Sequence, residues 1–169
     1  DNYDSNTITK IKKSGFLCNV NSNSEIISYI MELMSSDNNK VLFRKSNKSN
    51  NMLTNLWISK VHKKAKEIFI QNCNIKYKKL TKIDLKEIAE CSYLEESIEV
   101  IQKHLYTKYG IILVIVPNIE GMKTDAVTFL LTNNIPVIGM SLRLKRYDYF
   151  WFTLLHELSH IHLHLFDAK

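Results

Sequence analysis

Two histidines and a glutamate in the last fifteen residues have the spacing of a metal site. His156 and His160 are four residues apart, and Glu157 directly follows the first of them. On a helix, residues i and i+4 lie on one face about one turn apart, so two imidazoles so placed can hold one Zn²⁺. The carboxylate beside them can take a proton from a zinc-bound water. This HExxH pattern predicts a hydrolytic metal site, with His156 and His160 as ligands and Glu157 as general base.

The residues around the motif predict an amphipathic helix that begins near Phe150. Apolar residues with helical spacing would form its buried stripe: Trp151, Leu154, Leu155, Leu158, Ile161 and Leu165. Phe152, Thr153 and the two histidines fall on another face, and Asp148 is the expected N-cap. The alternative is a buried amphipathic helix that carries histidines by coincidence. The agreement of stripe, motif and helix propensity favours the metal helix.

Two more histidines follow the motif. His164 is four residues beyond His160, so it lies near the metal face, where it would orient a ligand or the substrate. A plain surface position agrees equally well with this spacing. Along a straight helix His156 and His164 are about 12 Å apart, too far for all three to bind one ion. His162 points elsewhere and is expected to be a polar surface residue.

The third metal ligand has no clear candidate within the chain. Catalytic zinc sites usually have three protein ligands and one open position. Asp167 is the one carboxylate after the motif, and on a continuing helix it would lie about 10 Å from His160. The metzincin pattern needs a glycine three residues after the second histidine, where Leu163 stands. We therefore expect the third ligand beyond Lys169, in a longer protein of which this chain is an internal fragment.

Composition indicates a globular protein without a disulfide framework. The 169 residues are 45% hydrophobic and include three widely spaced cysteines, Cys18, Cys73 and Cys91, with no CxxC pair. Reduced thiols in a cytoplasm are the simplest interpretation. The first residues carry no signal peptide, and no apolar run is long enough to span a bilayer, so no membrane partner is expected.

The net charge of +6 lies entirely before residue 109, because residues 109–169 hold five basic and five acidic residues. Its densest stretches are 60–66 and 76–79. Contact with nucleic acid is one interpretation of this surplus. A solvated helix face is favoured, because no combined aromatic and basic binding surface accompanies it.

Hydrophobic periodicity predicts several helices in the first two thirds of the chain. They are expected at about 26–34 with Ser22 or Ser24 as cap, 52–71, 83–90 with Thr81 as cap, and 94–109 followed by Gly110. Residues 1–23 and 35–51 are rich in Asn, Ser and other polar residues, as in loops.

A small sheet is expected before the metal helix. Strands are predicted at 111–116, 126–132 and 136–142, the last two joined by Asn133-Asn134 as a hairpin. Helices followed by a sheet and a final helix make an α+β fold. The sheet would pack on the apolar face of the metal helix, and its edge strand could bind an extended peptide by strand addition.

Several stretches resemble the ImmA/IrrE family of metallopeptidases. They are residues 110–117, 128–130, 136–138 and 146–164. The most specific parts are Phe150-Trp151-Phe152-Thr153-Leu154 before the motif and His164 after it. Residues 42–46 and 56–58 resemble the linker of HigA-like regulators, which join an N-terminal helix-turn-helix to this peptidase domain. The resemblance covers roughly residues 40–165.

The resemblance implies a zincin-like fold, with residues 1–51 as a linker-like segment and 52–169 as a peptidase domain truncated after its metal helix. It implies a gluzincin-like site with His156 and His160 on Zn²⁺, Glu157 as base and an acidic third ligand after Lys169. Ser159 stands where the family commonly has Gly.

The same resemblance implies a cytoplasmic protein of a bacterium or phage. Family members cleave repressor-type proteins or act as regulators in stress and toxin–antitoxin systems, so the implied partner is a regulatory protein. DNA would be bound only through a helix-turn-helix preceding Asp1.

Two functions from different classes therefore follow. One is a zinc endopeptidase that acts on a repressor-like protein. The other is a non-catalytic sensing or binding domain of a DNA-binding regulator or antitoxin. They differ at Glu157, because an enzyme needs a base there and a binding module does not. The presence of Glu157 favours the enzyme.

Overall fold

The computed structural model describes residues 5–15, 22–35, 52–71, 74–94 and 97–163. The α-helices within these ranges are α1 (Ser5–Lys13), α2 (Asn23–Ser35), α4 (Met52–Gln71), α5 (Lys82–Glu90), α6 (Ile98–His104) and α7 (Tyr147–Leu163). Its strands are β1 (Ile112–Ile115), β2 (Ala126–Leu131) and β3 (Ile135–Met140). The fold is therefore α+β, as predicted. Most of the expected loop at 35–51 lies outside the described residues.

The three strands form one sheet in the order β1-β3-β2. β1 pairs with β3 in parallel, and β2 pairs with β3 antiparallel, with Thr128 opposite Ile138. The predicted hairpin is confirmed. Its turn holds Asn133 and Asn134 at φ of 61° and 59°, a left-handed conformation that asparagine tolerates better than most residues.

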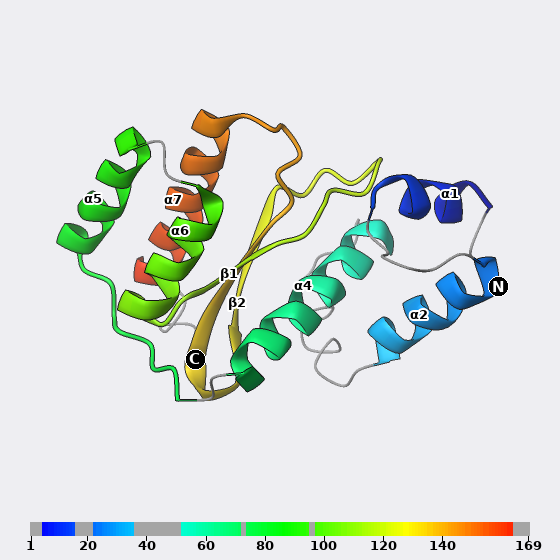
Figure 1. Ribbon diagram of the computed structural model, residues 1–169, viewed down its shortest axis with the longest axis horizontal. Helices are drawn as coiled ribbons and strands as arrows, with labels where there is room; N and C mark the ends of the chain where they lie inside the picture. Colours follow the sequence, from blue (N-terminus) through cyan, green and yellow to red (C-terminus); the bar gives the residue numbers. More distant parts are fainter. Residues whose placement is uncertain (1–4, 16–21, 36–51, 72–73, 95–96, 164–169) are drawn as a thin grey trace.

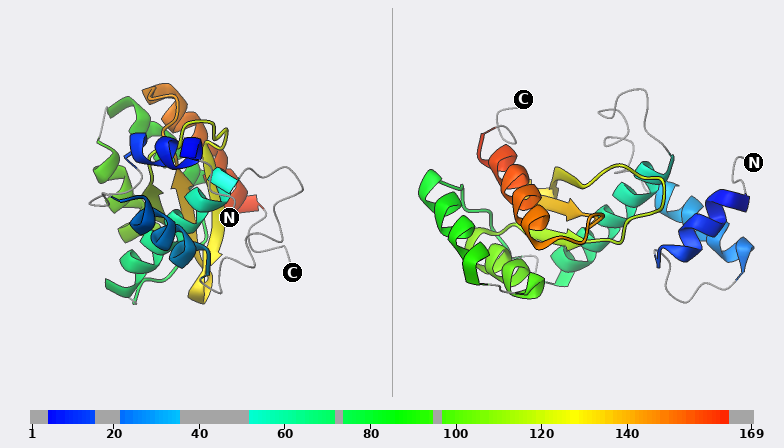
Figure 2. Two further views of the ribbon diagram at one scale, coloured as in Figure 1. Left: turned by 90° about the vertical axis from the view of Figure 1, so that its right-hand side faces the viewer. Right: turned by 90° about the horizontal axis from the view of Figure 1, so that it is seen from above.

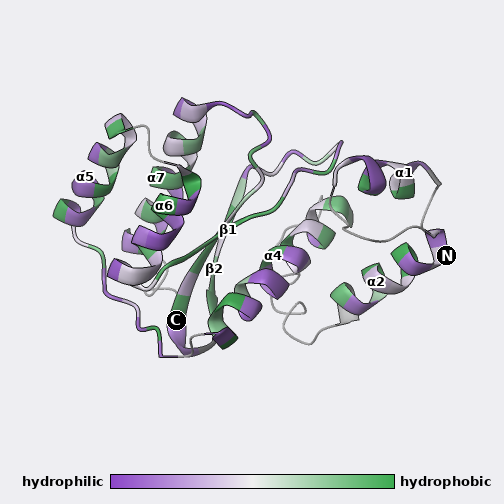
Figure 3. Cartoon of the chain, in the orientation of Figure 1, coloured by the Kyte–Doolittle hydropathy of each residue, from purple (hydrophilic) through white to green (hydrophobic). Residues whose placement is uncertain are grey.

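The sheet is covered on both faces, because side chains of successive strand residues point to opposite sides. Figure 1 and Figure 2 show α4 on one side of the sheet and α5, α6 and α7 on the other, with α1 and α2 beyond α4. Hydrophilic and hydrophobic residues alternate along α4 and α5 (Figure 3), as expected for helices with one buried face.

Each face has its own hydrophobic cluster. The α4 side buries Val137 of β3 together with Leu56, Trp57 and Val61 of α4. The cluster on the α7 side contains Ile138 and Met140 of β3. It also contains Ile101 of α6, Leu105 of the following turn, and Trp151, Leu154, Leu158 and Ile161 of α7. Four of the residues predicted for the buried stripe of the metal helix are buried, and Leu155 is half-buried.

A glycine in the central strand allows α4 to lie close to the sheet. A Cβ built on Gly139 would come within 2.5 Å of Cγ1 of Val61. Real Cβ atoms do not approach a neighbour so closely, so a larger residue would push α4 away from β3.

The first helix was not predicted. Residues 1–23 have the composition of a loop, but α1 buries Ile8 and Ile11 in the same cluster as Ile26 and Ile30 of α2. A nine-residue helix with two buried isoleucines is too short for its period to stand out from a polar background. Tertiary packing, rather than propensity, is what holds such a helix in place.

Two predicted N-caps are confirmed. The Thr81 hydroxyl accepts from the Asp84 amide, and the Asp84 side chain accepts from the Thr81 amide. Ser22 and Glu25 exchange the equivalent hydrogen bonds at the start of α2.

The predicted cap of α7 is wrong. The helix begins at Tyr147, which places Asp148 inside the first turn instead of before it. The Asp148 carboxylate accepts from the Arg146 guanidinium at 3.1 and 2.6 Å, and its charge favours the positive helix end.

The helix expected at 94–109 is divided into pieces. A 3₁₀ turn covers Cys91–Leu94, α6 follows, and Leu105–Tyr109 form a π-helical turn. Gly110 ends the turn at φ 66°, and its amide donates to the carbonyl of Tyr106. The predicted C-terminal end is therefore confirmed, while the start lies a few residues later than predicted.

A buried histidine makes this packing sensitive to acid. His62 of α4 is 6% exposed and stacks on Phe129 of β2 at 5.5 Å between ring centroids. Burial and, secondarily, the charge of Lys66 lower the His62 pKa to about 4. The unfolded chain, with an ordinary histidine pKa of about 6.5, therefore binds a proton that the folded protein does not.

We expect the free energy of unfolding to fall by up to about 3 kcal/mol as the pH is lowered from about 7 to about 4. The stabilisation that comes from a neutral, buried His62 is fully present above pH 6.5. It is lost as the pH falls from the pKa of the unfolded chain to that of the folded protein. Urea titrations across this range measure the slope. His62→Phe, which keeps an aromatic ring in the site, should flatten it. An unchanged slope in this variant would contradict the assignment.

Candidate functional site

The two motif histidines lie side by side on α7. Their Nε2 atoms are 3.0 Å apart, and their rings are 4.6 Å apart at an interplanar angle of 85°. Both side chains are exposed, on the face of α7 that does not pack on the sheet. The structure therefore places His156 and His160 together, with their ring nitrogens pointing at one location.

This geometry fits a shared metal ion. Two imidazole nitrogens at about 2.0–2.1 Å from a tetrahedral ion lie about 3.3 Å apart, which is close to the separation of this pair. Without an ion, one ring donates its N–H to the other, with roles that depend on the tautomer. Both arrangements need the same rotamers, so the rings require little rearrangement to bind.

The candidate base is held against the sheet. Glu157 is half-buried, and its Oε2 accepts a hydrogen bond of 2.5 Å from the Thr128 hydroxyl of β2. This contact joins the motif to a strand residue 29 positions earlier. Sequence analysis did not identify Thr128, because nothing in the local pattern indicates which strand residue faces the glutamate.

The hydrogen bonds at one end of the hairpin show which way the main chain of β2 points. The Met140 carbonyl accepts from the Val116 amide on the β1 side, whereas the Ser141 amide donates to the Asp125 carbonyl on the β2 side. Main-chain groups of successive strand residues point in opposite directions. Those of Asp125 therefore point toward β3, and those of the next residue point away from it.

The same alternation leaves one side of β2 open. By register, the N–H and C=O groups of Ala126, Thr128 and Leu130 point away from β3. Pro136, opposite Leu130, agrees with this because its missing N–H would not have faced β2. Within the described ranges, no residue makes a hydrogen bond to these outward groups. A free strand edge thus passes the candidate base.

The other edge of the sheet is closed. The Leu113 carbonyl of β1 accepts from the Gln102 side chain at 2.8 Å, and the Ile115 carbonyl accepts from Lys64 at 3.4 Å. Side chains that cover an edge strand prevent further strands from pairing with it. The protein therefore protects β1 and leaves β2 accessible.

Aromatic side chains continue the exposed ridge of α7 before the histidines. Phe152 is 68% exposed, and its ring lies nearly parallel to that of His156, 6.5 Å away. Tyr149 lies 6.4 Å from Phe152 and donates its hydroxyl hydrogen to Asp125 at 2.9 Å. These rings restrict the orientations available to His156.

Asp125 joins the start of β2 to the loop that precedes α7. Its carboxylate accepts from Arg143 at 2.8 and 3.2 Å, as well as from Tyr149. The hydrogen bond from Arg143, more than that from Tyr149, holds the Asp125 pKa below its usual value. The carboxylate is therefore ionised at neutral pH, where it links the start of β2 to α7 and to the loop before it.

The predictions for the two histidines after the motif, His162 and His164, have different outcomes. His162 was expected on the surface, but its Nδ1 lies 2.7 Å from the Leu80 carbonyl, so it joins α7 to the segment before α5. His164 and Asp167 lie outside the described residues. In the described part of the chain, no three His, Cys, Asp or Glu side chains are arranged to hold a metal. The expectation of a third ligand beyond Lys169 stays a prediction.

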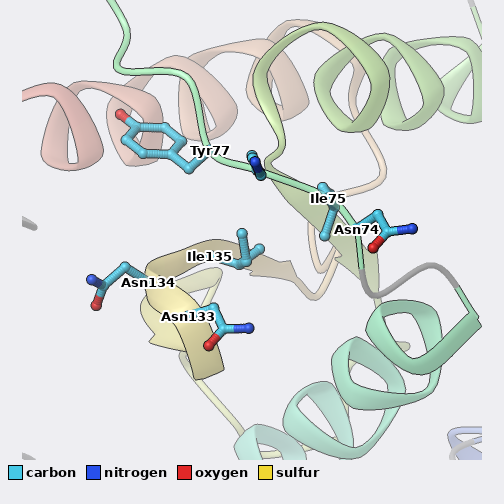
Figure 4. Close-up of a pocket in the computed structure, with 7 residues that line it drawn as sticks. Asn74, Ile75, Tyr77, Asn133, Asn134 and Ile135 are labelled. Carbon is cyan, nitrogen blue, oxygen red and sulfur yellow. The ribbon is translucent and has the colours of Figure 1, made fainter.

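A polar cavity of about 450 Å³ lies between the segment before α5 and the β2–β3 turn. Figure 4 shows Asn133, Asn134 and Ile135 on one side of it and Asn74, Ile75 and Tyr77 on the other. Its lining residues within the described ranges include neither a histidine nor a carboxylate, unlike the exposed face of α7.

Comparison with known proteins adds no assignment. No protein-family model, no curated protein and no solved structure matches the chain. No helix in the described ranges has the length and apolar character needed to cross a membrane.

Proposed function

We propose that this chain carries the core of a zinc-dependent endopeptidase site that acts on an extended segment of a protein. The observation that carries the proposal is the His156–His160 pair on α7, next in sequence to Glu157, whose carboxylate is held by Thr128 beside the outer edge of β2. Peptide hydrolysis at a metal site requires metal ligands, a general base and a surface that holds the peptide.

His156 and His160 would hold the ion through Nε2, with a third ligand from outside the described residues. Bound Zn²⁺ would supply Lewis acidity, which makes water more acidic and polarises a carbonyl. Glu157 would accept the proton of the attacking water and pass it to the departing amine. The Thr128 hydroxyl donates a hydrogen bond to this carboxylate and fixes its direction.

The open edge of β2 supports an extended substrate. A peptide that pairs with Ala126, Thr128 and Leu130 gains main-chain hydrogen bonds irrespective of its sequence. The residue opposite Thr128 then lies next to the contact between Thr128 and Glu157. Thr128 would thus bind the peptide through its main chain and orient the base through its side chain.

The resemblance of residues 110–164 to the ImmA/IrrE family extends this proposal. A zincin-like arrangement is supported by the packing of α7 on a sheet whose β2 edge is free. The target would then be a repressor-like regulatory protein in a bacterial or phage cytoplasm. DNA would be reached only through a further helix-turn-helix domain.

Metal analysis tests the first step. If residues beyond Lys169 supply the third ligand, protein that includes them should bind one equivalent of Zn²⁺ or Co²⁺, whereas residues 1–169 alone should bind it substoichiometrically, because two imidazoles leave an ion short of ligands. His156→Asn and His160→Asn should each abolish binding in the longer form.

His104→Gln, on another helix, is the matched control and should keep full metal content. Undiminished binding in both motif variants would contradict the assignment of the ligands.

A further inference from the structure

A second cavity lies at the start of α7, away from the polar one in Figure 4. It has a volume of about 300 Å³ and opens between the end of β3, the start of α6 and the loop 141–146. Parallel strands β1 and β3 both end near it, and the space beyond the carboxyl ends of parallel strands is a frequent place for ligands.

The wall of this cavity is mostly apolar. Ile98 comes from α6, Met140 is the last residue of β3, and Phe150 lies in the first turns of α7. Leu142 and Leu144 of the loop add further apolar side chains. At about 30 Å³ per non-hydrogen atom, the space accommodates about ten such atoms, which is the size of a medium-chain fatty acid.

Positive charge surrounds this apolar space. Arg143, Lys145 and Arg146 line the cavity, and Asp125 is the one acidic residue that lines it. Asp125 pairs with Arg143, and Arg146 pairs with Asp148 outside the lining. Within the described residues, Lys145 has no carboxylate in salt-bridge range. Among the described residues, no carboxylate thus neutralises Lys145 beside the cavity.

The backbone that carries this lysine is strained. Leu142 and Lys145 adopt φ of 49° and 45°, a left-handed conformation that is unfavourable for residues with a Cβ. The Lys145 amide donates to the Leu142 carbonyl at 3.2 Å, which closes the turn. Strained residues of this kind persist where the surroundings hold them and often accompany binding sites.

We propose that this cavity binds a medium-chain carboxylate, with the acyl chain among Ile98, Met140 and Phe150 and the carboxylate beside Lys145. An apolar cavity of this volume with one unneutralised cation at its mouth matches an anion with an apolar tail of about eight carbons. The site differs in location and chemistry from the histidine pair, and it does not depend on a metal.

Octanoate is the probe, and ¹³C-methyl-methionine NMR is the measurement. Met140 lines the cavity, whereas Met122 is buried in the cluster on the other side of the sheet. Octanoate should shift the Met140 resonance saturably, with a dissociation constant of about 1 mM or below, and leave Met122 unchanged. Octanol and octylamine test the need for the negative charge.

Two variants separate the contributions. Lys145→Met should weaken octanoate binding about fivefold and leave octanol binding unchanged. Lys79→Met, which changes an exposed lysine elsewhere, should leave the binding of both compounds unchanged. Ile98→Trp should fill the cavity and abolish the Met140 shift, with native circular dichroism as the control for folding.

Two results overturn the proposal. One is the absence of a saturable Met140 shift below the micelle concentration of octanoate. The other is equal binding of octanoate, octanol and octylamine, which would leave an apolar cavity without charge selection. Loss of metal binding in other experiments would not affect either readout.

Discussion

Glu157→Gln is expected to lower the rate of peptide cleavage by about 10²–10⁴-fold in a zinc-loaded, C-terminally longer form of the protein. Glutamine keeps the size of the side chain and can still bond to Thr128, but it cannot accept a proton from water. Metal content should be unchanged, because the ligands are the histidine pair on the neighbouring face of α7. Cleavage of an unstructured repressor-like protein, followed by mass spectrometry of the fragments, measures the effect.

Glu120→Gln removes an exposed carboxylate outside the motif and is the matched control. It should retain parental activity. Equal cleavage by Glu157→Gln and the parent would show that Glu157 is not the base. Absence of cleavage in the zinc-loaded parent would instead favour a sensing or binding domain, in which Glu157 serves to join α7 to β2 through Thr128.

Gly110→Ala is expected to cause the largest loss of stability, about 3 kcal/mol or more. Gly110 has φ 66°, which disfavours any residue with a Cβ, and that Cβ would lie 2.2 Å from the Lys76 carbonyl oxygen. The clash is with backbone, so no rotamer change relieves it. The start of β1 and the segment before α5 would have to move apart, which destabilises the fold. The free energy of unfolding from urea titration measures this loss.

Gly15→Ala separates the two causes. Gly15 has nearly the same φ, 65°, but no atom lies within 4 Å of an added Cβ. This variant should lose only about 1 kcal/mol, the cost of the left-handed backbone. Equal losses at the two glycines would mean that the close contact with Lys76 contributes nothing.

Several local features follow from the sequence because their causes are local. Thr81 and Asp84 cap α5 through groups three residues apart, and Gly110 ends a helical segment by adopting a conformation that other residues avoid. Periodicity predicted α4 with the bounds that the structure has. The spacing of His156 and His160 likewise determines that they share a face of α7.

Other features could be seen only in the tertiary structure. Some depend on nearby residues and others on residues far away in the sequence. Asp148 has the residue type of an N-cap, yet α7 begins at Tyr147, one residue before it. The Asp148 carboxylate accepts a hydrogen bond from Arg146 instead of capping the helix. The helix α1 exists because Ile8 and Ile11 find a hydrophobic surface formed by later residues. Neither outcome is encoded within a window of a few residues.

The sequence alone determined which chemistry the last helix can offer, because i and i+4 neighbours on a helix are fixed by its geometry. Only the tertiary structure decided what surrounds that chemistry. It placed Thr128 of β2 against Glu157, closed the β1 edge with Gln102 and left the β2 edge open. These are contacts between segments far apart in the chain, and their partners depend on strand order and register rather than on local spacing.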